Sequence, residues 1–228
     1  MTIPERVHKI QQIIADTAKH CGRATKDIQL LAVSKGQSIR AIQVAFAAGI
    51  SDFGENYLQE AQLKIHALQA LPICWHFIGP IQSNKAKNIA QNFSWVHSVG
   101  REKIANLLAK HRPKHLPALN LCLQVNLDNE EKKFGISPQQ LTQLALVVSQ
   151  LPRVKLRGLM AIPIPLLGEE QQYESLVRLT GLFNKLNKEL NLSMDTLSMG
   201  MSDDLVAAIR AGSTMVRIGR AIFGERKR

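Results

Sequence analysis

The sequence predicts a (β/α)8 barrel, which is a closed sheet of eight parallel strands with a helix after each strand. Short apolar runs alternate with amphipathic helical patterns eight times along the chain, an order typical of parallel strands joined by helices. The 228 residues divided among eight units give about 28 residues each, which is a compact version of the spacing that such a barrel requires. The alternative is an open, doubly wound sheet, because periodicity does not show whether a sheet closes.

An amphipathic helix precedes the first strand. Ile3, Val7, Ile10, Ile14 and Ala18 recur at helical spacing, so that their side chains share one face. We therefore expect an extra N-terminal helix outside the eight repeats.

The expected strands are short and apolar, as strands buried on both faces of a parallel sheet are. They span residues 28–33, 50–53, 75–78, 95–99, 119–127, 154–162, 196–199 and 215–218.

Helical patterns fill the intervals between these strands. Ser38 is expected to cap the first of them, and further helices are expected at 57–68, 83–90, 104–108, 141–151 and 176–190. After the seventh strand, Ser202 is expected to cap a helix with Asp203 and Asp204 in its first turn. No linker, low-complexity stretch or repeat in the sequence divides the chain, so we expect one domain over residues 1–228.

The composition is that of an ordinary globular protein. Apolar residues make up 45% and charged residues 21%, which argues against disorder, fibres and disulfide scaffolds. No apolar run approaches the roughly 20 residues that cross a bilayer, and residues 1–14 mix acidic and polar residues into their apolar pattern, unlike a secretory signal. We therefore expect no membrane partner.

Cysteine usage indicates a reducing compartment. Cys21, Cys74 and Cys122 are odd in number and lack the short spacing of a zinc site. Neither a disulfide framework nor a metal site is expected, and a cytoplasmic location fits. Cys74 and Cys122 lie in apolar runs and are expected to pack as small apolar side chains.

The net charge of +11 and a pI near 9.8 admit a nucleic acid, an acidic partner or an anionic small ligand. The positive charge is spread along the chain and is concentrated only at residues 101–115 and 226–228, and 5% aromatic residues leave few stacking platforms for single strands. A solvated surface is therefore the favoured interpretation, and nucleic-acid binding is the disfavoured one.

Lys35 stands where a barrel carries its chemistry, because the loops after the strands build the functional site. It follows five mostly apolar residues, and poor solvation there disfavours the ammonium form. A neutral amine can attack an aldehyde and form a Schiff base. The competing interpretation is a lysine that extends from the strand end into solvent.

Glycine-bearing turns follow the seventh and eighth strands. Gly200 and Ser202 lie in one turn, and Gly219 and Arg220 lie in the other. Glycine lets backbone N–H groups approach a ligand, and barrels commonly hold phosphate at these two loops; the alternative is that these residues only form turns and a cap. A Schiff-base lysine together with a phosphate cradle indicates an aldehyde phosphate, with pyridoxal 5′-phosphate (PLP) as the leading candidate.

Five motifs in order resemble those of a known family. They are Val33-Ser34-Lys35, Phe53-Gly54-Glu55-Asn56-Tyr57, residues 75–79 with Gln82 and Asn84-Lys85, residues 197–203, and Val216-Arg217-Ile218-Gly219. From about residue 28 to residue 224 the chain resembles the pyridoxal phosphate homeostasis proteins, the YggS-like or proline synthase co-transcribed family. The resemblance implies a barrel of the alanine racemase N-terminal type that binds and buffers PLP and supports vitamin B6 and amino-acid balance, without established catalysis.

The resemblance also implies roles for single residues. Lys35 would form the Schiff base, Asn56 would lie near the ring, and Arg217 would face the pyridine nitrogen. Ser202 and the backbone of Gly219 and Arg220 would hold the phosphate, and Met199 of the same motif is included among the cofactor contacts. No catalytic residue is expected; PLP-dependent apo-enzymes are candidate recipients of the cofactor, and a monomer is expected.

The sequence departs from the family pattern at two places. Gly36 and Gln37 follow the lysine, where many relatives continue with Thr-Lys, so a second nearby amine is not expected. Arg220 stands where many relatives have threonine, which removes a hydroxyl donor and adds a charge.

The alternative function is a PLP-dependent racemase or related enzyme. A two-base racemase needs a proton donor and a proton acceptor on opposite faces of its substrate. Lys35 supplies one, the racemase resemblance would take the other, a tyrosine, from a further domain, and this chain has only Tyr57 and Tyr173. We therefore expect weak or no racemisation. A Schiff-base aldolase is disfavoured because Lys155 lies at the start of its strand.

Two further groups have simpler interpretations. His76 and His97 lie on expected strands and are interpreted as hydrogen-bonded histidines of the core or the rim rather than as general bases. Lys132, Lys133 and Phe134 are expected to form a mobile loop.

Overall fold

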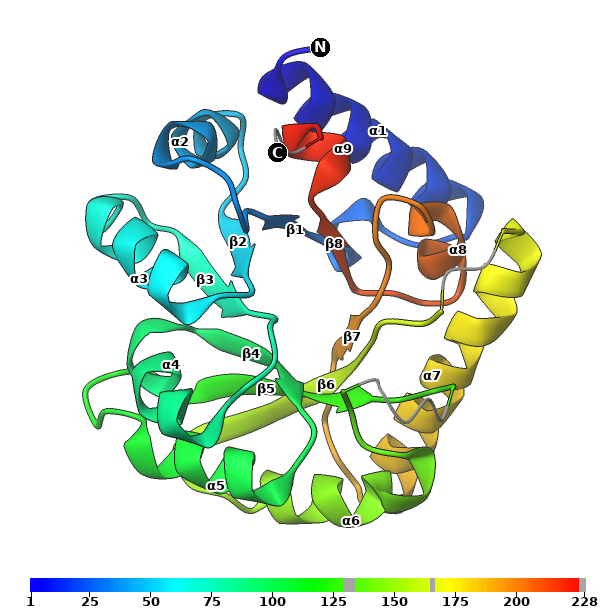
Figure 1. The fold of residues 1–228 in the computed structure, drawn as a ribbon. Helices are drawn as coiled ribbons and strands as arrows, with labels where there is room; N and C mark the ends of the chain where they lie inside the picture. The colour runs from blue at the N-terminus through cyan, green and yellow to red at the C-terminus, as the bar shows by residue number, and fades with distance from the viewer. Residues whose placement is uncertain (129–133, 165–166, 226–228) are drawn as a thin grey trace.

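Eight parallel strands form a closed barrel in the computed structural model, which describes residues 1–128, 134–164 and 167–225. Each strand pairs with the next in chain order, and the last pairs with the first, as Figure 1 shows. The predicted (β/α)8 barrel is therefore confirmed, and the open sheet is excluded. The strands are β1 (Gln29–Val33), β2 (Asp52–Glu55), β3 (Cys74–Phe77), β4 (Trp95–Val99), β5 (Leu119–Val125), β6 (Val154–Ala161), β7 (Thr196–Ser198) and β8 (Met215–Ile218).

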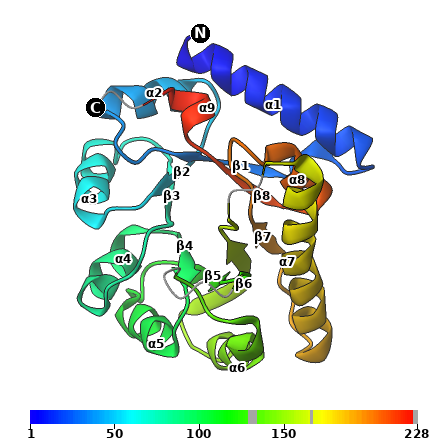
Figure 2. The same ribbon diagram turned by 45° about the vertical axis from the view of Figure 1, so that its right-hand side comes forward.

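Helices surround the barrel on its outer face (Figures 1 and 2). None of the helices in the described part of the chain is both long and apolar enough to span a membrane. The helices are α1 (Ile3–His20), α2 (Ile39–Ala47), α3 (Leu58–Ala67), α4 (Ala86–Asn92), α5 (Glu102–His111), α6 (Pro138–Ser149), α7 (Glu169–Glu189), α8 (Leu205–Arg210) and α9 (Arg220–Phe223), with short 3-10 turns η1 (Thr25–Asp27) and η2 (Ser83–Lys85).

The extra N-terminal helix is confirmed. Thr2 and Glu5 begin α1 with a reciprocal capping box, in which the Thr2 N–H donates to Glu5 Oε2 at 2.8 Å and Thr2 Oγ1 accepts from the Glu5 N–H at 3.5 Å. The apolar stripe of α1 is buried, and the helix contacts α8 and α9, beside which it lies in Figure 2. The first helix of the chain therefore packs against the last two.

The apolar core has two parts because side chains of a strand point alternately to opposite faces. The larger part lies between the strands and the helices. The smaller part fills the barrel and consists of Leu31, Trp95, Cys122, Met160 and Met215. Cys122 is fully buried, as predicted, and the described structure contains no disulfide among the three cysteines.

The prediction that Ser202 caps the helix after the seventh strand is wrong. The helix α8 begins at Leu205, so that Asp203 and Asp204 precede it. The Asp204 carboxylate accepts the Met201 N–H at 2.6 Å and thereby holds a turn before the helix. The Ser202 hydroxyl instead faces the next loop, where Ser202 Oγ accepts weakly from the Ala221 N–H at 3.4 Å.

Candidate functional site

A cavity of about 570 Å³ collects six of the seven residues that the sequence predicts as cofactor contacts. Arg217 lies within β8, and the others follow the ends of β1, β2, β7 and β8 at the carboxyl end of the barrel. Such a convergence is the usual location of a functional site in this fold. The six residues are Lys35, Asn56, Ser202, Arg217, Gly219 and Arg220.

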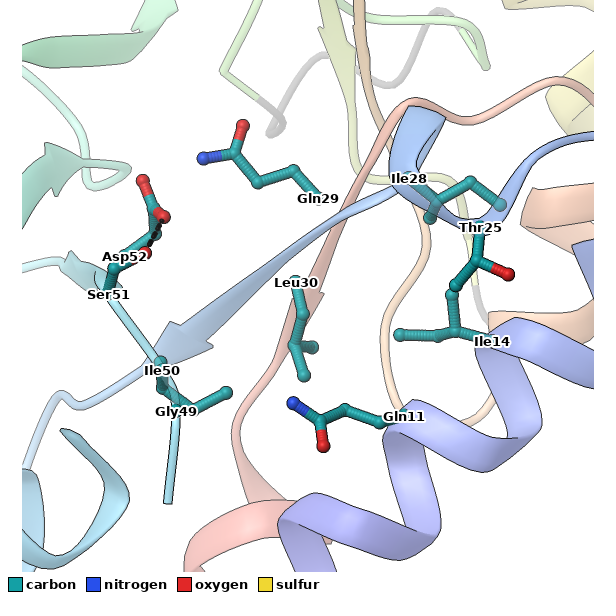
Figure 3. A pocket seen from close by; sticks show the side chains of 10 residues that line it. All are labelled: Gln11, Ile14, Thr25, Ile28, Gln29, Leu30, Gly49, Ile50, Ser51 and Asp52. Atoms are coloured by element: carbon teal, nitrogen blue, oxygen red, sulfur yellow. Dashed lines mark hydrogen bonds between the residues drawn. The ribbon is translucent and has the colours of Figure 1, made fainter. Parts of the chain in front are cut away.

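A second cavity, of about 360 Å³, lies at the opposite end of the barrel, between the start of β1, the start of β2 and α1 (Figure 3). Ser51 Oγ donates to Asp52 Oδ2 there at 2.7 Å. None of the predicted site residues lines this cavity. The amino end of such a barrel generally contributes stability rather than chemistry.

Met199 does not line the larger cavity. Its side chain is fully buried in the core between strands and helices, because it alternates with Ser198, whose side chain points into the barrel. The Met199 N–H donates to Met215 O at 3.1 Å, and Met199 O accepts from Ser213 Oγ at 2.7 Å. Met199 therefore supports the junction of β7 and β8.

Arg217 carries a buried positive charge to the base of the cavity. Its side chain is 4% exposed, and burial lowers its pKa to about 10, so the guanidinium is charged at neutral pH. The guanidinium donates to the Ser198 carbonyl, to Ser198 Oγ at 3.0 Å and to Ala161 O at 2.9 Å. These acceptors fix the orientation of the guanidinium.

A chain of hydrogen bonds continues from Arg217 through the barrel interior. Ser198 Oγ lies 2.7 Å from His97 Nδ1, His97 Nε2 lies 2.9 Å from His76 Nδ1, and His76 Nε2 lies 2.9 Å from Asp52 Oδ1. Both histidines are fully buried. Burial lowers the pKa of His76 and takes that of His97 well below its usual range, so both are neutral.

The two ends of this chain define the direction of every hydrogen bond in it. Burial alone would raise the pKa of Asp52, but hydrogen bonds from His76, Ser51 and Gln29 outweigh it and lower the pKa to about 2. The ionised carboxylate accepts, so His76 Nε2 donates and its Nδ1 accepts from His97 Nε2. His97 Nδ1 then accepts from the Ser198 hydroxyl, whose oxygen accepts from Arg217. The interpretation of both residues as core histidines is confirmed.

Cys74 lies beside the end of this hydrogen-bond chain that Asp52 forms. Its thiol and the side chains of Asp52 and His76 offer potential metal-ligand atoms within 4.8 Å of one another. Burial raises the pKa of Cys74 to about 12, so the thiol is neutral at neutral pH, and Asp52 and His76 already bond to each other. Hydrogen bonding alone therefore accounts for this group.

The rim of the cavity is polar. The Arg220 guanidinium pairs with the Asp203 carboxylate and so joins the loops after β7 and β8. Asn56 Oδ1 is buried and has no hydrogen-bond partner within the described residues. A buried acceptor without a donor is uncommon in a complete structure, so this oxygen is suited to receive a donor from a ligand.

Sequence reasoning missed Lys64, which lies on α3 beneath the loop that carries Lys35. Its side chain is buried against Glu55 and Glu60. The available signal was its position, since Leu58, Ala61, Lys64 and Leu68 continue one buried helical stripe in which a lysine is unexpected.

Two lysines of one predicted loop, Lys132 and Lys133, lie outside the described residues, as do the basic residues 226–228. Phe134 of the same loop is described and is 68% exposed.

The chain belongs to the class of proteins built on the alanine racemase barrel, since a family model described as alanine racemase, N-terminal domain, matches residues 8–227. Alanine racemase from Corynebacterium glutamicum has the same fold, with a TM-score of 0.72 and 13% identity, and the alignment covers 98% of this chain and 62% of that one.

Closer relatives define the particular family. A protein of Pseudomonas aeruginosa named pyridoxal phosphate homeostasis protein is 53% identical over 225 residues, covering 99% of this chain and 96% of the relative. PipY of Synechococcus elongatus, in a structure with PLP bound, has a TM-score of 0.81 and 34% identity, covering 92% of this chain and 100% of that one. The chain therefore belongs to the family of pyridoxal phosphate homeostasis proteins.

Proposed function

We propose that this protein holds PLP on Lys35 as a Schiff base and takes part in intracellular vitamin B6 homeostasis, with no robust catalysis of its own. The observation that carries the proposal is the convergence of Lys35, Arg217 and the loops after β7 and β8 on one cavity. The name of the Pseudomonas relative and the PLP bound to PipY support it.

The residues present fit the cofactor. The cavity combines a lysine, a buried guanidinium and a glycine-bearing turn with the unpartnered oxygen of Asn56. A planar ligand with a phosphate and a ring nitrogen needs groups of these kinds. Ser202 with the backbone of Gly219 and Arg220 would hold the phosphate.

When bound, the cofactor supplies an aldehyde carbon that can condense with a primary amine, with loss of one water molecule. Lys35 offers that amine at the cavity wall. Arg217 would donate to the ring nitrogen, and a charged donor there disfavours ring protonation and weakens the ring as an electron sink. This arrangement suits storage and carriage of the cofactor better than carbanion chemistry.

The proposal extends to the whole chain. Residues 1–228 form one cofactor-binding domain that acts as a monomer in the cytoplasm and passes PLP to apo-enzymes that depend on it. Equilibrium sedimentation and cofactor transfer to a recipient apo-enzyme would test these parts separately.

Absorbance spectroscopy tests the proposed attachment. Purified protein incubated with PLP and then desalted should show a visible band, and Lys35→Ala should abolish it. Lys155→Ala, which changes a lysine at the opposite end of the barrel, is the matched control and should retain the band. A colourless wild-type protein, or an unchanged band in Lys35→Ala, would refute the proposal.

A further inference from the structure

A buried ion cluster lies directly beneath the segment that carries Lys35. The Lys64 side chain of α3 is 5% exposed, and its Nζ donates to Ser34 O at 2.7 Å, to Glu55 Oε1 at 2.7 Å and to Glu60 Oε1 at 2.5 Å. An ammonium group has three hydrogens, so these contacts use all of them. The position of Nζ is therefore determined from three directions.

The same three charged groups hold the backbone on both sides of Lys35. On one side, Ser34 O accepts from Lys64 and Ser34 Oγ donates to Glu55 Oε1 at 2.6 Å. On the other side, the Gly36 N–H donates to Glu60 Oε1 at 2.6 Å. Gly36 has a φ of 71°, so the chain turns sharply just after the lysine. The cluster thus defines both the entry and the exit of the one residue between them.

Stability alone does not explain a cluster of this kind. Glu55 is fully buried, and burial raises the pKa of its carboxyl, against the effect of Lys64. Removing charges from water is costly, and replacing a buried ion pair by apolar side chains is often neutral or stabilising. What such a cluster supplies here is geometry, because short bonds to charged groups resist displacement more than apolar contacts do.

We propose that Lys64, acting with Glu55 and Glu60, is a positioning residue for Lys35: the cluster holds the Ser34–Gly36 backbone so that the Lys35 amine stays directed into the cavity. This inference rests on the proposed function. Its consequence is selective, because displacement of Lys35 weakens covalent attachment of PLP and leaves the phosphate and ring contacts intact.

The first test uses Glu60→Ala, since Glu60 is partly exposed and its removal frees the Gly36 N–H. The matched control is Glu189→Ala, which removes the carboxylate of another lysine–glutamate pair four residues apart, Lys185 and Glu189, on the surface of α7. Circular dichroism establishes that each variant is folded. Affinities are then measured for PLP and for pyridoxine 5′-phosphate, which has no aldehyde and cannot form the covalent bond.

Glu60→Ala should bind PLP about tenfold more weakly than wild type, which corresponds to about 1.4 kcal/mol, with unchanged affinity for pyridoxine 5′-phosphate. Glu189→Ala should match wild type for both ligands. Equal loss for the two ligands, or no loss for PLP, would overturn the inference. A wild-type protein that shows no visible band with PLP would instead overturn the proposed function.

A second variant keeps the role of Lys64 itself testable. Lys64→Met alone leaves Glu55 buried without its cation, so we combine it with Glu55→Gln, which removes that charge. The double variant should show the same selective loss of PLP affinity of about tenfold or more. If the folded double variant binds PLP as wild type does, the ammonium has no positioning role.

Discussion

Arg217 illustrates how single residues prepare this site. Its charge is held inside the barrel by three oxygen acceptors, and the hydroxyl among them begins a chain that ends at the Asp52 carboxylate. Because Asp52 is ionised and both histidines are neutral, every donor of the hydrogen-bond chain meets an acceptor. Protonation of His97 would turn its Nδ1 into a donor, and the Ser198 hydroxyl would then lose the acceptor that it has now. This arrangement of donors and acceptors therefore requires a neutral His97.

This requirement makes stability depend on pH through His97. Folding depresses the pKa of His97 below its usual 6.5 by burial, so the unfolded chain binds a proton that the folded chain excludes. The associated stability is fully present above about pH 6.5 and is lost as the pH falls below it. Chemical denaturation between pH 7 and 5 should show this decline.

In the variant His97→Gln the decline should be shallower by up to about 1.4 kcal/mol per pH unit. At pH 7 the free energy of unfolding of this variant should be about 1–3 kcal/mol lower than that of wild type, because a buried hydrogen bond of the barrel interior is lost. His66→Gln, at an exposed position of α3, is the control and should keep the wild-type dependence. Identical slopes for wild type and His97→Gln would contradict the directional chain.

The location of a side chain could be predicted from the sequence where the strand map alone determines it. Lys35, Asn56 and Arg217 follow or end strands and so reach the carboxyl end of the barrel together. Met199 does not reach the cavity, because a shift of one residue along a strand reverses the face of the sheet to which a side chain points. The hydrogen bonds of His76 and His97 and the contact of Lys64 with Ser34 O could not be predicted, since each joins elements far apart in sequence.

At the scale of elements, one of the two predicted helix caps is confirmed and the other is wrong. Ser38 caps α2 as predicted, with Ser38 Oγ accepting from the Ala41 N–H at 3.2 Å. Ser202 does not cap α8, because the helix begins only at Leu205 and the Asp204 carboxylate, which accepts the Met201 N–H, holds residues 201–204 in a turn before it. The residue at which this helix begins could not be predicted without knowing where the preceding strand directs the chain.

Gly200 is what directs the chain after β7. Its φ is 97°, and a Cβ there would lie 2.5 Å from the Ala208 Cβ of α8, while its carbonyl accepts the Arg217 N–H at 2.9 Å. Gly200→Ala should therefore lower the free energy of unfolding by more than about 2 kcal/mol, through strain and overlap together.

Gly22→Ala separates the two causes of that loss. Gly22 also has a positive φ, of 66°, but a Cβ added to it would have no atom of the described residues within 4 Å, so only strain of about 1–2 kcal/mol applies. Thermal or chemical unfolding of both variants checks the comparison. If Gly200→Ala is no less stable than Gly22→Ala, close packing of α8 on this turn is not what requires the glycine.

At the scale of the whole molecule, closure of the barrel brings β8 beside β1. Lys35 and Arg217 are therefore neighbours in space although they lie near opposite ends of the sequence. Periodicity predicted the eight repeats but not closure, which depends on the pairing of the first strand with the last. The α1 helix packs against α8 and α9 on the outside of this junction.

The composition of the cavity predicts little or no racemisation. A two-base mechanism needs a second proton donor facing Lys35 across the substrate, and neither Tyr57 nor Tyr173 lines the described cavity. Purified protein with PLP and L-alanine should produce D-alanine no faster than Lys35→Ala does, as measured by chiral chromatography. Turnover clearly above that control would show that another group acts as the second base.

Covalent mapping tests most directly whether Lys35 holds the cofactor. Wild-type protein saturated with PLP is reduced with borohydride, which makes the linkage permanent, and is then digested and analysed by peptide mass spectrometry. One phosphopyridoxyl group per chain on the peptide containing Lys35 is the expected result. A modification that falls mainly on another lysine, or a protein that remains unmodified at saturating PLP, would contradict the proposed cofactor site.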